Sequence, residues 1–560
     1  MNKYPRIAIA QINPIVGDLT GNATKIIQYI ERAKAEGAKV VIFPEQVVTG
    51  YPAQDLLLHE DFIRDTMYVT EQIVKNTQGI TAIIGTVRAT ARGPGGKSAY
   101  NTAIVAKDGE IIAEQQKTLL PTYDVFHELR YFTPAKKVKP IEIDGIKYGI
   151  QLCEDMWDED YDRKITKELA NQGAELMINL SASPYYVHKK KVRTKIVQSH
   201  AKNNELPFLY INMVGAQDEL IFDGGSIVAN ADGTLAYQLP QFRECLQIIE
   251  LDKKPITELE IKIKEEEIFE ALKLGVRDYF QKNGLRKAVL GLSGGIDSTL
   301  TAVIAKEALG AENVIGIAMP SKFSTDHSIT DAEALAKNLG IRLDYVPIKE
   351  MYDSAVKAMQ ASFEGKSFDV TEENIQARLR MMILMAYTNK HGYTLLSTSD
   401  KSETAIGYTT LYGDMSGALS VISDLTKPEA YKVARWYNEK NGEIIPEHIL
   451  TKPPSPELKP GQVAPFDYER LSPIMELITN RVPLRKIHAL GYKWDEIRIV
   501  YQKWKNAEFK RFQSPIALKC KPTSFGKGRI YPVTNRYIPS ALFENDEEKI
   551  ECEETVCVLK

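Results

Sequence analysis

The stretch that decides the fold runs from Lys287 to Leu309 and reads KAVLGLSGGIDSTLTAVIAKEAL. It predicts a buried strand over residues 288–293 and a helix over 298–309, because a short apolar run is followed by apolar residues at helical spacing. Between them, small residues let the backbone approach a ligand, and the N–H groups at the start of a helix favour an anion. Asp297 adds a carboxylate suited to Mg²⁺ beside bound phosphates.

A glycine-rich turn without a ligand is the ordinary alternative to a phosphate-binding loop. The GG pair alone would fit that alternative, but the complete string SGGIDS between a strand and a helix indicates phosphate binding. The string is not a Walker A loop, since the GK[ST] ending is absent.

The residues around this loop continue the alternation of strands and helices. Apolar runs predict further strands over 314–320, 342–348 and 394–399, and helical spacing predicts helices over 268–281, 331–339 and 373–390. Strands that alternate with helices in this way favour an α/β domain with a doubly wound parallel sheet.

The first half of the chain is also predicted to be α/β. The pattern indicates a helix over 22–36 and short strands over 6–13, 39–45, 81–87, 102–107, 147–153, 174–181, 208–214 and 225–233. Several of these strands end in a polar residue at the tip, where layered α/β folds place their chemistry.

A proline-bearing and charged segment, DKKPITELEIKIKEEE, separates the two halves. We therefore expect a first domain over residues 1–250, a linker over 251–266 and a second domain over 267–540. Residues 541–560 form an acidic C-terminal tail, to which we assign no function.

Composition excludes several classes of protein. The 560 residues carry 71 basic and 74 acidic side chains, a net charge of −3, so no global basic field favours nucleic acid. No apolar run approaches the roughly 20 residues of a membrane-spanning helix, and no signal peptide is recognisable. The five cysteines are odd in number and contain no CxxC pair, which favours a reducing cytoplasm over a disulfide framework.

Three residues at or near strand ends in the first half suggest an amide-hydrolysing site. Cys153 could present a nucleophilic sulfur, Glu45 could act as a general base, and Lys117 could stabilise negative charge. Each residue also has an ordinary alternative. An unpaired cysteine is most often a small buried hydrophobe, and single glutamates and lysines are most often solvated.

These residues stand in motifs that resemble the glutamine-amidase branch of the nitrilase superfamily over about residues 5–250. The motifs are FPE at 43–45, K-x-LLP-x-Y at 117–123 and LCEDMW at 152–157. The resemblance implies an α-β-β-α layered domain in which Glu45 is the general base, Lys117 stabilises the oxyanion and Cys153 is the nucleophile. It also implies that Tyr123, Ser183 and Lys189 bind glutamine and that Glu128 is an additional active-site glutamate.

The second half resembles the ATP pyrophosphatases and, within them, the NAD synthetase family. The motifs are SGGIDS at 293–298, PSKFST at 320–325, ENIQARLRM at 373–381, STSDKSE at 397–403 and EFKRFQSP at 508–515. The resemblance implies an adenine-nucleotide α-hydrolase-like fold. It implies ATP contacts from Gly291, Leu292, Ser293, Gly294, Gly295, Ile296, Asp297, Ser298 and Thr398.

The same resemblance assigns the other substrates of the second half. Asp297 and Glu403 would hold Mg²⁺, and Asn374, Glu403 and Lys510 would contact deamido-NAD⁺. Ser324 and Lys401 would reach phosphates or the adenylate.

Taken whole, the chain resembles the glutamine-dependent NAD synthetase family. The resemblance implies that ATP activates deamido-NAD⁺ and that ammonia from L-glutamine, passed through an internal tunnel, completes NAD⁺. Homo-oligomers are expected by the same resemblance, and no nucleic acid or membrane partner is expected. The alternatives are an amidotransferase acting on another acid, a protein in which one half is only a scaffold, and a plain nitrile or amide hydrolase.

Overall fold

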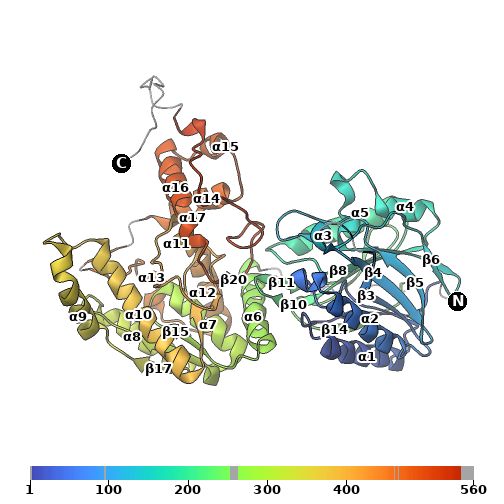
Figure 1. Cartoon of the computed structure of the whole chain (residues 1–560), viewed down its shortest axis with the longest axis horizontal. Coiled ribbons are helices and arrows are strands. Elements are labelled where there is room, and N and C mark those ends of the chain that lie inside the picture. The colour runs from blue at the N-terminus through green and yellow to red at the C-terminus, as the bar shows by residue number, and fades with distance from the viewer. Residues whose placement is uncertain are drawn as a thin grey trace.

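The computed structural model describes residues 3–91, 93, 96–251, 263–459, 461–463 and 466–543. Two lobes lie side by side in Figure 1, and a group of C-terminal helices extends from the second lobe. Most of the predicted linker (252–262) and of the predicted acidic tail (544–560) lies outside the described residues. Among the helices that are described, none is long and apolar enough to cross a membrane.

The first lobe contains two six-stranded sheets. Their strands are β1 (Ile7–Gln11), β2 (Val40–Ile42), β3 (Thr81–Ala89), β4 (Ala99–Lys107), β5 (Glu110–Gln116), β6 (Ile141–Ile143), β7 (Ile146–Leu152), β8 (Leu176–Ser181), β9 (Phe208–Asn212), β12 (Ile227–Ala229), β13 (Leu235–Gln238) and β14 (Cys245–Ile249). One sheet has the order β14-β1-β2-β3-β4-β5 and the other β13-β12-β9-β8-β7-β6. In each sheet three central strands run parallel, β1-β2-β3 and β7-β8-β9, with antiparallel strands at the edges.

Alternation along the strands produces the layers of this lobe. In β1, Ile7 and Ile9 lie in a buried cluster with Ile150 of the opposite sheet, whereas Ala8 and Ala10 lie in a cluster with helix residues. Helices α1 (Leu19–Ala35) and α2 (Glu60–Val74) cover one sheet, and α4 (Ile165–Asn171) and α5 (Lys189–Asn204) cover the other. The predicted α-β-β-α arrangement is confirmed.

The second lobe is built on a parallel sheet of the order β17-β16-β15-β18-β19-β20. Its strands are β15 (Ala288–Gly291), β16 (Val314–Ala318), β17 (Arg342–Tyr345), β18 (Thr394–Ser397), β19 (Leu419–Ser420) and β20 (Ile516–Ala517). Helices α6 (Lys264–Lys282), α7 (Ile296–Leu309), α8 (Asp326–Leu339) and α12 (Lys427–Asn441) cover one face, and α10 (Val370–His391) covers the other. The doubly wound prediction is confirmed, and the strand order reverses at β15, which is where such folds bind ligands.

Several elements were not predicted from the sequence. They include α3 (Glu128–Tyr131), α9 (Lys349–Met359), α11 (Lys401–Ile406), α13 (Glu447–Thr451), α14 (Tyr468–Thr479), α15 (Leu484–Ala489), α16 (Trp494–Asn506) and α17 (Glu508–Arg511). The shortest of these helices have too few apolar residues to show a helical period. Helices α2, α4, α5 and α12 were not predicted either, although α2, α5 and α12 are long enough to show such a period. In addition, α6 begins at Lys264, inside the stretch that was expected to be linker.

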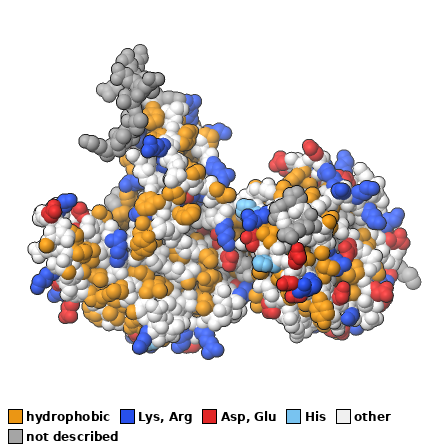
Figure 2. Space-filling view, in the orientation of Figure 1, with side chains coloured by type: hydrophobic (Ala, Val, Ile, Leu, Met, Phe, Trp, Pro, Cys, Tyr) orange, Lys and Arg blue, Asp and Glu red, His pale blue; other side chains and the backbone are white. Residues whose placement is uncertain are grey.

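Basic and acidic side chains are interspersed on the face drawn in Figure 2, and hydrophobic side chains gather on the second lobe. On that face the charges do not form a continuous basic stripe like that of a nucleic-acid groove. The mixture of both signs on this face is what nearly equal numbers of basic and acidic side chains, 71 and 74, would produce.

The two lobes share a hydrophobic core. Helix α6 of the second lobe packs against β10 (Val214–Gln217) and β11 (Leu220–Asp223) of the first lobe. Val214, Ile221 and Leu272 belong to the same buried cluster. One packed junction therefore holds the two lobes together.

A buried polar cluster fixes this junction. The Asp278 carboxylate on α6 accepts hydrogen bonds from the Asn13 amide at 2.7 Å and the Ala216 N–H at 2.8 Å, and lies 3.4 Å from Lys282 Nζ. Lys282 in turn donates to the Ala216 carbonyl at 2.8 Å. Burial lowers the pKa of Lys282 to about 8 although Asp278 opposes the shift.

We expect Asp278→Ala to lower the free energy of unfolding by about 3–5 kcal/mol, because it leaves the buried Lys282 ammonium without its carboxylate. Urea-induced unfolding would measure the change. Glu270→Ala on the same helix removes only the partly exposed pair with Lys273, so about 1 kcal/mol or less is expected. Equal effects of the two substitutions would contradict the role of Asp278.

Candidate active sites

The three predicted residues of the first site converge. Glu45 follows β2, Lys117 follows β5 and Cys153 follows β7. Lys117 Nζ lies 2.8 Å from Glu45 Oε1 and 2.8 Å from the carboxylate of Glu128, and all three side chains are buried. The fourth predicted residue, Glu128, therefore belongs to the same cluster.

The Glu45 carboxylate is held on both oxygens. Oε1 also accepts a hydrogen bond from the Asn101 side-chain amide at 2.7 Å, and Oε2 accepts one from the Ala182 N–H at 2.9 Å. Burial opposes the charge on Lys117, but Glu128 and Glu45 together raise its pKa well above the ordinary value. Lys117 is thus a permanent cation beside a fixed carboxylate.

Cys153 begins a tight turn, Cys153–Met156, and its backbone has a φ of 38°, in the left-handed region that disfavours most side chains. Burial raises the pKa of its thiol well above the ordinary value, and the nearby Glu45 raises it further, while Lys117 opposes the shift. The thiol is therefore neutral at rest, and nucleophilic attack needs a base to take its proton.

Asp155 links the two segments that carry Lys117 and Cys153, and it was not predicted from the sequence. Its carboxylate accepts hydrogen bonds from the N–H groups of Thr118 at 3.0 Å, Leu119 at 2.8 Å and Leu152 at 3.1 Å. Burial raises its pKa to about 7 in spite of these bonds. Its place in the motif LCEDMW was visible in the sequence, but its partners were not.

The residues predicted to bind glutamine lie around one cavity with the nucleophile. Cys153, Tyr123, Ser183 and Lys189 line a space of about 180 Å³. Lys189 Nζ lies 3.9 Å from the centre of the Trp157 ring, and burial, together with Arg193, lowers its pKa to about 8. The cavity also contains carboxylates, Glu154 and Asp124, which the sequence reasoning did not select.

The phosphate-loop motif of the second lobe lies at the C-terminal end of β15 and opens α7, as predicted. A side chain at Gly294 would place its Cβ 2.4 Å from the Ser328 carbonyl of α8, so the loop packs tightly on that helix. The Ser298 hydroxyl accepts a hydrogen bond from the Ser293 N–H at 3.2 Å and donates to the Gly295 carbonyl at 3.1 Å. These contacts fix the loop shape.

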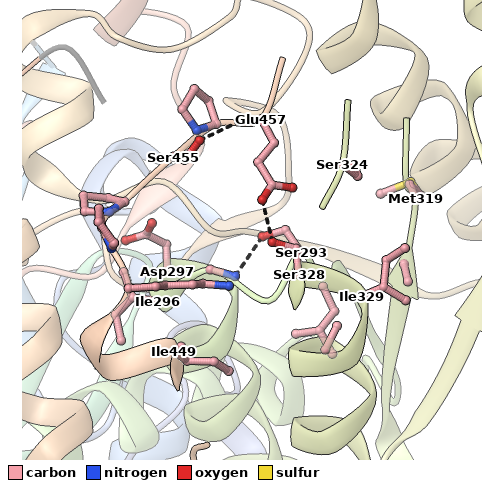
Figure 3. A pocket seen from close by; sticks show the side chains of 18 of the residues that line it. Ser293, Ile296, Asp297, Met319, Ser324, Ser328, Ile329, Ile449, Ser455 and Glu457 are labelled. Carbon is pink, nitrogen blue, oxygen red and sulfur yellow. Dashed lines mark hydrogen bonds between the residues drawn. The ribbon is translucent and has the colours of Figure 1, made fainter. Parts of the chain in front are cut away.

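A second cavity, of about 280 Å³, opens beside this loop (Figure 3). The predicted residues that line it are Leu292, Ser293, Gly295, Ile296, Asp297, Ser324 and Glu403. Gly291, Gly294, Ser298 and Thr398 belong to the adjoining loops but are not among the lining residues. In Figure 3, Ser293 and Asp297 lie on one side of the pocket, and Glu457 lies above them on another segment.

A buried lysine joins the two predicted metal ligands. Lys427 Nζ lies 2.6 Å from Asp297 Oδ2, 2.9 Å from Glu403 Oε1 and 3.0 Å from Asp400 Oδ2. Burial opposes the charge on Lys427, but Asp297, Asp400 and Glu403 raise its pKa well above the ordinary value. Neither Lys427 nor Asp400 was selected from the sequence.

Asn374 and Lys510, predicted to contact the dinucleotide, do not line this cavity. Both form hydrogen bonds to the neighbouring segment Gly407–Thr410. Lys510 Nζ donates to the carbonyls of Gly407 at 2.8 Å and Thr409 at 2.6 Å, and Asn374 accepts from the Thr410 hydroxyl at 2.7 Å. Burial lowers the pKa of Lys510.

Lys401 is placed differently from the expectation. Its ammonium is buried between Asp424 at 2.9 Å and Glu476 at 3.1 Å, and it donates to the Thr523 carbonyl at 2.9 Å. It is not among the residues that line the cavity, so the structure gives it a structural role instead of the predicted contact with phosphate or adenylate. Its partners come from α14 and from loops far away in the sequence, which the motif STSDKSE does not reveal.

Other lining residues were not predicted. Arg380 lies in the cavity wall, donates to the Met319 carbonyl at 3.0 Å, and has its pKa lowered to about 10 by burial. Glu457 accepts from the hydroxyls of Ser328 and Thr325, each at 2.7 Å, and so holds a proline-rich segment over the cavity (Figure 3).

Comparison with known proteins matches each half of the chain to a family. Residues 6–260 match the carbon-nitrogen hydrolase family model, and residues 268–514 match the NAD synthase model. The glutamine-dependent NAD(+) synthetase of Thermotoga maritima is 39% identical over 96% of this chain and 99% of its own. That of a Synechocystis species is 41% identical over 95% of this chain and 99% of its own. This chain belongs to the glutamine-dependent NAD(+) synthetase family.

Solved structures of that family have the same architecture. The glutamine-dependent NAD⁺ synthetase from Acinetobacter baumannii, in complex with ADP, is 34% identical, with a TM-score of 0.77 over 95% of this chain and 98% of its own. The one from Cytophaga hutchinsonii has a TM-score of 0.81 at 22% identity, over 94% of this chain and 97% of its own, and shows the shared fold. The family resemblance predicted from the motifs is confirmed.

We expect Asp155→Asn to reduce ammonia release from L-glutamine about 10- to 100-fold, because an amide nitrogen facing the N–H groups cannot accept their hydrogen bonds. Asp162→Asn provides a matched control, since Asp162 is an exposed residue of the following segment. An Asp155→Asn protein with the parent rate would show that the Lys117 and Cys153 segments do not depend on this carboxylate.

Proposed function

We propose that this protein makes NAD⁺ from deamido-NAD⁺, ATP and ammonia, and that it obtains the ammonia by hydrolysing L-glutamine. The observation that carries the proposal is the presence of two built sites in one chain. One places Cys153 with Glu45 and Lys117, and the other places the SGGIDS loop beside Asp297 and Glu403. The products are NAD⁺, AMP, pyrophosphate and glutamate.

In the first site, Glu45 takes the proton of the Cys153 thiol as the sulfur attacks the side-chain amide of glutamine. The C–N bond breaks, the nitrogen leaves as ammonia with that proton, and a thioester remains on Cys153. Lys117 stabilises the oxyanion of each tetrahedral intermediate. Glu45 then activates water, which releases glutamate and restores the thiol.

The cavity residues orient this substrate. Tyr123, Ser183 and Lys189 bind glutamine, with the Lys189 ammonium suited to the α-carboxylate. Burial lowers the pKa of Lys189, and an incoming carboxylate would raise that pKa again and stabilise the ammonium form. Ring contact with Trp157 holds the ammonium in place.

In the second site, the nicotinate carboxylate of deamido-NAD⁺ attacks the α-phosphorus of ATP, which releases pyrophosphate and gives an adenylate. Ammonia then attacks the acyl carbon and AMP leaves. The loop Gly291–Ser298 binds ATP with Thr398 nearby, and Ser324 lies at the phosphate side. Asn374, Glu403 and Lys510 bind deamido-NAD⁺. Asn374 and Lys510 also hold the segment Gly407–Thr410 beside it by hydrogen bonds.

The carboxylates of this site fit Mg²⁺. Asp297 lines the cavity, and within the described part of the chain its buried Oδ1 has no hydrogen-bond partner. Carboxylate oxygens are the ligands that Mg²⁺ prefers, with water and substrate phosphates completing its shell. Asp297 and Glu403 would hold the ion, which would neutralise charge on the departing pyrophosphate.

Internal passage of ammonia between the sites belongs to the same proposal. The lobes share a packed core, and a further cavity of about 270 Å³ extends from Glu128 and Tyr51 to the turn at Gln217–Leu220. That turn joins β10 to β11, the strands on which α6 packs. Domain boundaries at 250 and 267, a homo-oligomer and a cytoplasmic location stay predictions from the sequence.

The test measures NAD⁺ formation from deamido-NAD⁺, ATP and Mg²⁺, with glutamine or with ammonium as nitrogen donor. The parent protein is expected to use both donors and to release AMP. Cys153→Ala should lose only the glutamine-supported rate, and Asp297→Ala should lose both by at least about 100-fold.

Each alternative gives a different result in this assay. Synthesis with ammonium alone in the parent protein would make the first lobe a scaffold. Glutamine hydrolysis without NAD⁺ formation would point to another acceptor acid or to a plain amidase.

The pH dependence of glutamine hydrolysis should report Glu128. Burial raises its pKa to about 7 although Lys117 opposes the shift. Below that pH Glu128 becomes neutral and its ion pair with Lys117 is lost, so kcat/KM should fall as the pH drops from 8 to 6. Glu128→Gln should have a plateau about tenfold lower and a smaller fall. A fall of unchanged size in the variant would assign the acid limb to another group, such as Asp155.

A further inference from the structure

One wall of the glutamine cavity comes from the other lobe. Lys519, which follows β20 of the second lobe, lines the cavity together with Cys153. Among the described residues of that lobe it is the one that does so. Its ammonium lies 3.4 Å from Asp124 Oδ2, and Asp124 also lines the cavity.

The hydrogen bonds of Lys519 show that it holds Asp124 rather than the substrate. An ammonium group has three donors. Lys519 Nζ uses two of them on the carbonyls of Lys521 at 2.8 Å and Pro522 at 2.6 Å, and only 2% of its side chain is exposed. The remaining direction is occupied by the Asp124 carboxylate.

Gly528, in the segment that follows Lys519, packs directly against the Asp124 carboxylate. A side chain at Gly528 would place its Cβ 2.2 Å from Asp124 Oδ1, so only glycine fits without displacing the carboxylate. The Lys527 N–H next to it donates to the Glu219 carboxylate at 3.0 Å, which fixes the segment on the first lobe. Lys519 and Gly528 therefore define the position of Asp124 from two sides.

Glu154 and Asp124, the two carboxylates that line the cavity, differ in how many hydrogen bonds they can still accept from a ligand. Glu154 accepts hydrogen bonds from the Tyr123 hydroxyl on both oxygens, at 3.0 and 3.1 Å, and from the Tyr161 hydroxyl at 3.0 Å. Burial also raises the pKa of Glu154, which disfavours its charged form. Asp124 keeps 32% of its side chain exposed, and within the described residues Lys519 is its ion-pair partner.

The substrate has a cationic group that a carboxylate with free hydrogen-bond acceptors, such as Asp124, could bind. L-Glutamine carries an α-carboxylate and an α-ammonium group, and the Lys189 ammonium, which has donors only, can serve the carboxylate alone. We propose that Asp124 binds the α-ammonium group of the substrate and that Lys519 and Gly528, from the second lobe, position it. This inference rests on the proposed hydrolysis of glutamine at Cys153.

The test compares two amides with the full-length protein. 4-Carbamoylbutanoate is glutamine without its α-amino group, so it has the same scissile amide and the same carboxylate. Ammonia release from both amides gives kcat and KM for each. Asp124→Asn is expected to lower kcat/KM for L-glutamine about 10- to 100-fold, mainly through KM, and to leave 4-carbamoylbutanoate unchanged.

The positioning residues have their own variants. Lys519→Met and Gly528→Ala should both reduce the preference for L-glutamine, by about 5- to 20-fold, and Lys519→Arg should keep most of it. Lys486→Met is the matched control, because Lys486 is an exposed lysine of the second lobe that lines neither the glutamine cavity nor the 270 Å³ cavity. Ammonium-supported NAD⁺ synthesis at the parent rate would show that each variant is folded.

Three results would overturn the inference. They are an unchanged preference in Asp124→Asn, an equal loss with both amides, and loss of the preference in Glu154→Gln alone, which would make Glu154 the receptor. Failure of the proposed function looks different, since the parent protein would then hydrolyse neither amide.

Discussion

A buried ammonium group surrounded by carboxylates determines the geometry of each active site. Lys117 lies between Glu45 and Glu128 in the first lobe, and Lys427 lies among Asp297, Asp400 and Glu403 in the second. Removing one partner of a buried ion pair costs about 3–5 kcal/mol, so these side chains cannot move independently. In the first lobe, the segments after β2 and β5 that carry Glu45 and Lys117 are therefore fixed relative to each other. In the second lobe, the same holds for α7, α11 and α12.

The first site is not complete within its own lobe. Its cavity takes Lys519 from the second lobe, and the Asp278 cluster and the shared core hold the two lobes in the arrangement that this requires. A movement at the synthetase sheet that displaced β20 would displace the residue that follows it. Glutamine binding would then depend on the state of the second lobe, through contacts that are not part of the catalytic triad.

The sequence predicted what is local and missed what is brought together by folding. Glu45, Lys117 and Cys153 could be selected because each stands in a short motif at or near a strand end, and the SGGIDS loop because strand, loop and helix are consecutive. Asp155, Lys427 and Lys519 could not, since each also has a partner in a distant segment, such as Thr118 for Asp155 and Asp124 for Lys519, and no spacing along the chain marks these contacts. Lys401 was misplaced for the same reason: it stands in a motif, but its buried partners, Asp424 and Glu476, are distant in sequence.

Burial also explains why the two chemistries suit one chain. Burial at the first site raises the pKa of Cys153, Glu128 and Asp155, in every case because the charged form loses hydration. The same loss of hydration disfavours ammonium relative to ammonia, which is the form that the proposed second step needs as a nucleophile. An ammonia molecule released beside Cys153 and kept out of water would therefore stay reactive, whereas one that reached bulk water at neutral pH would be protonated. The burial that makes the thiol depend on Glu45 as a base would thus also preserve ammonia in the proposed passage to the second lobe.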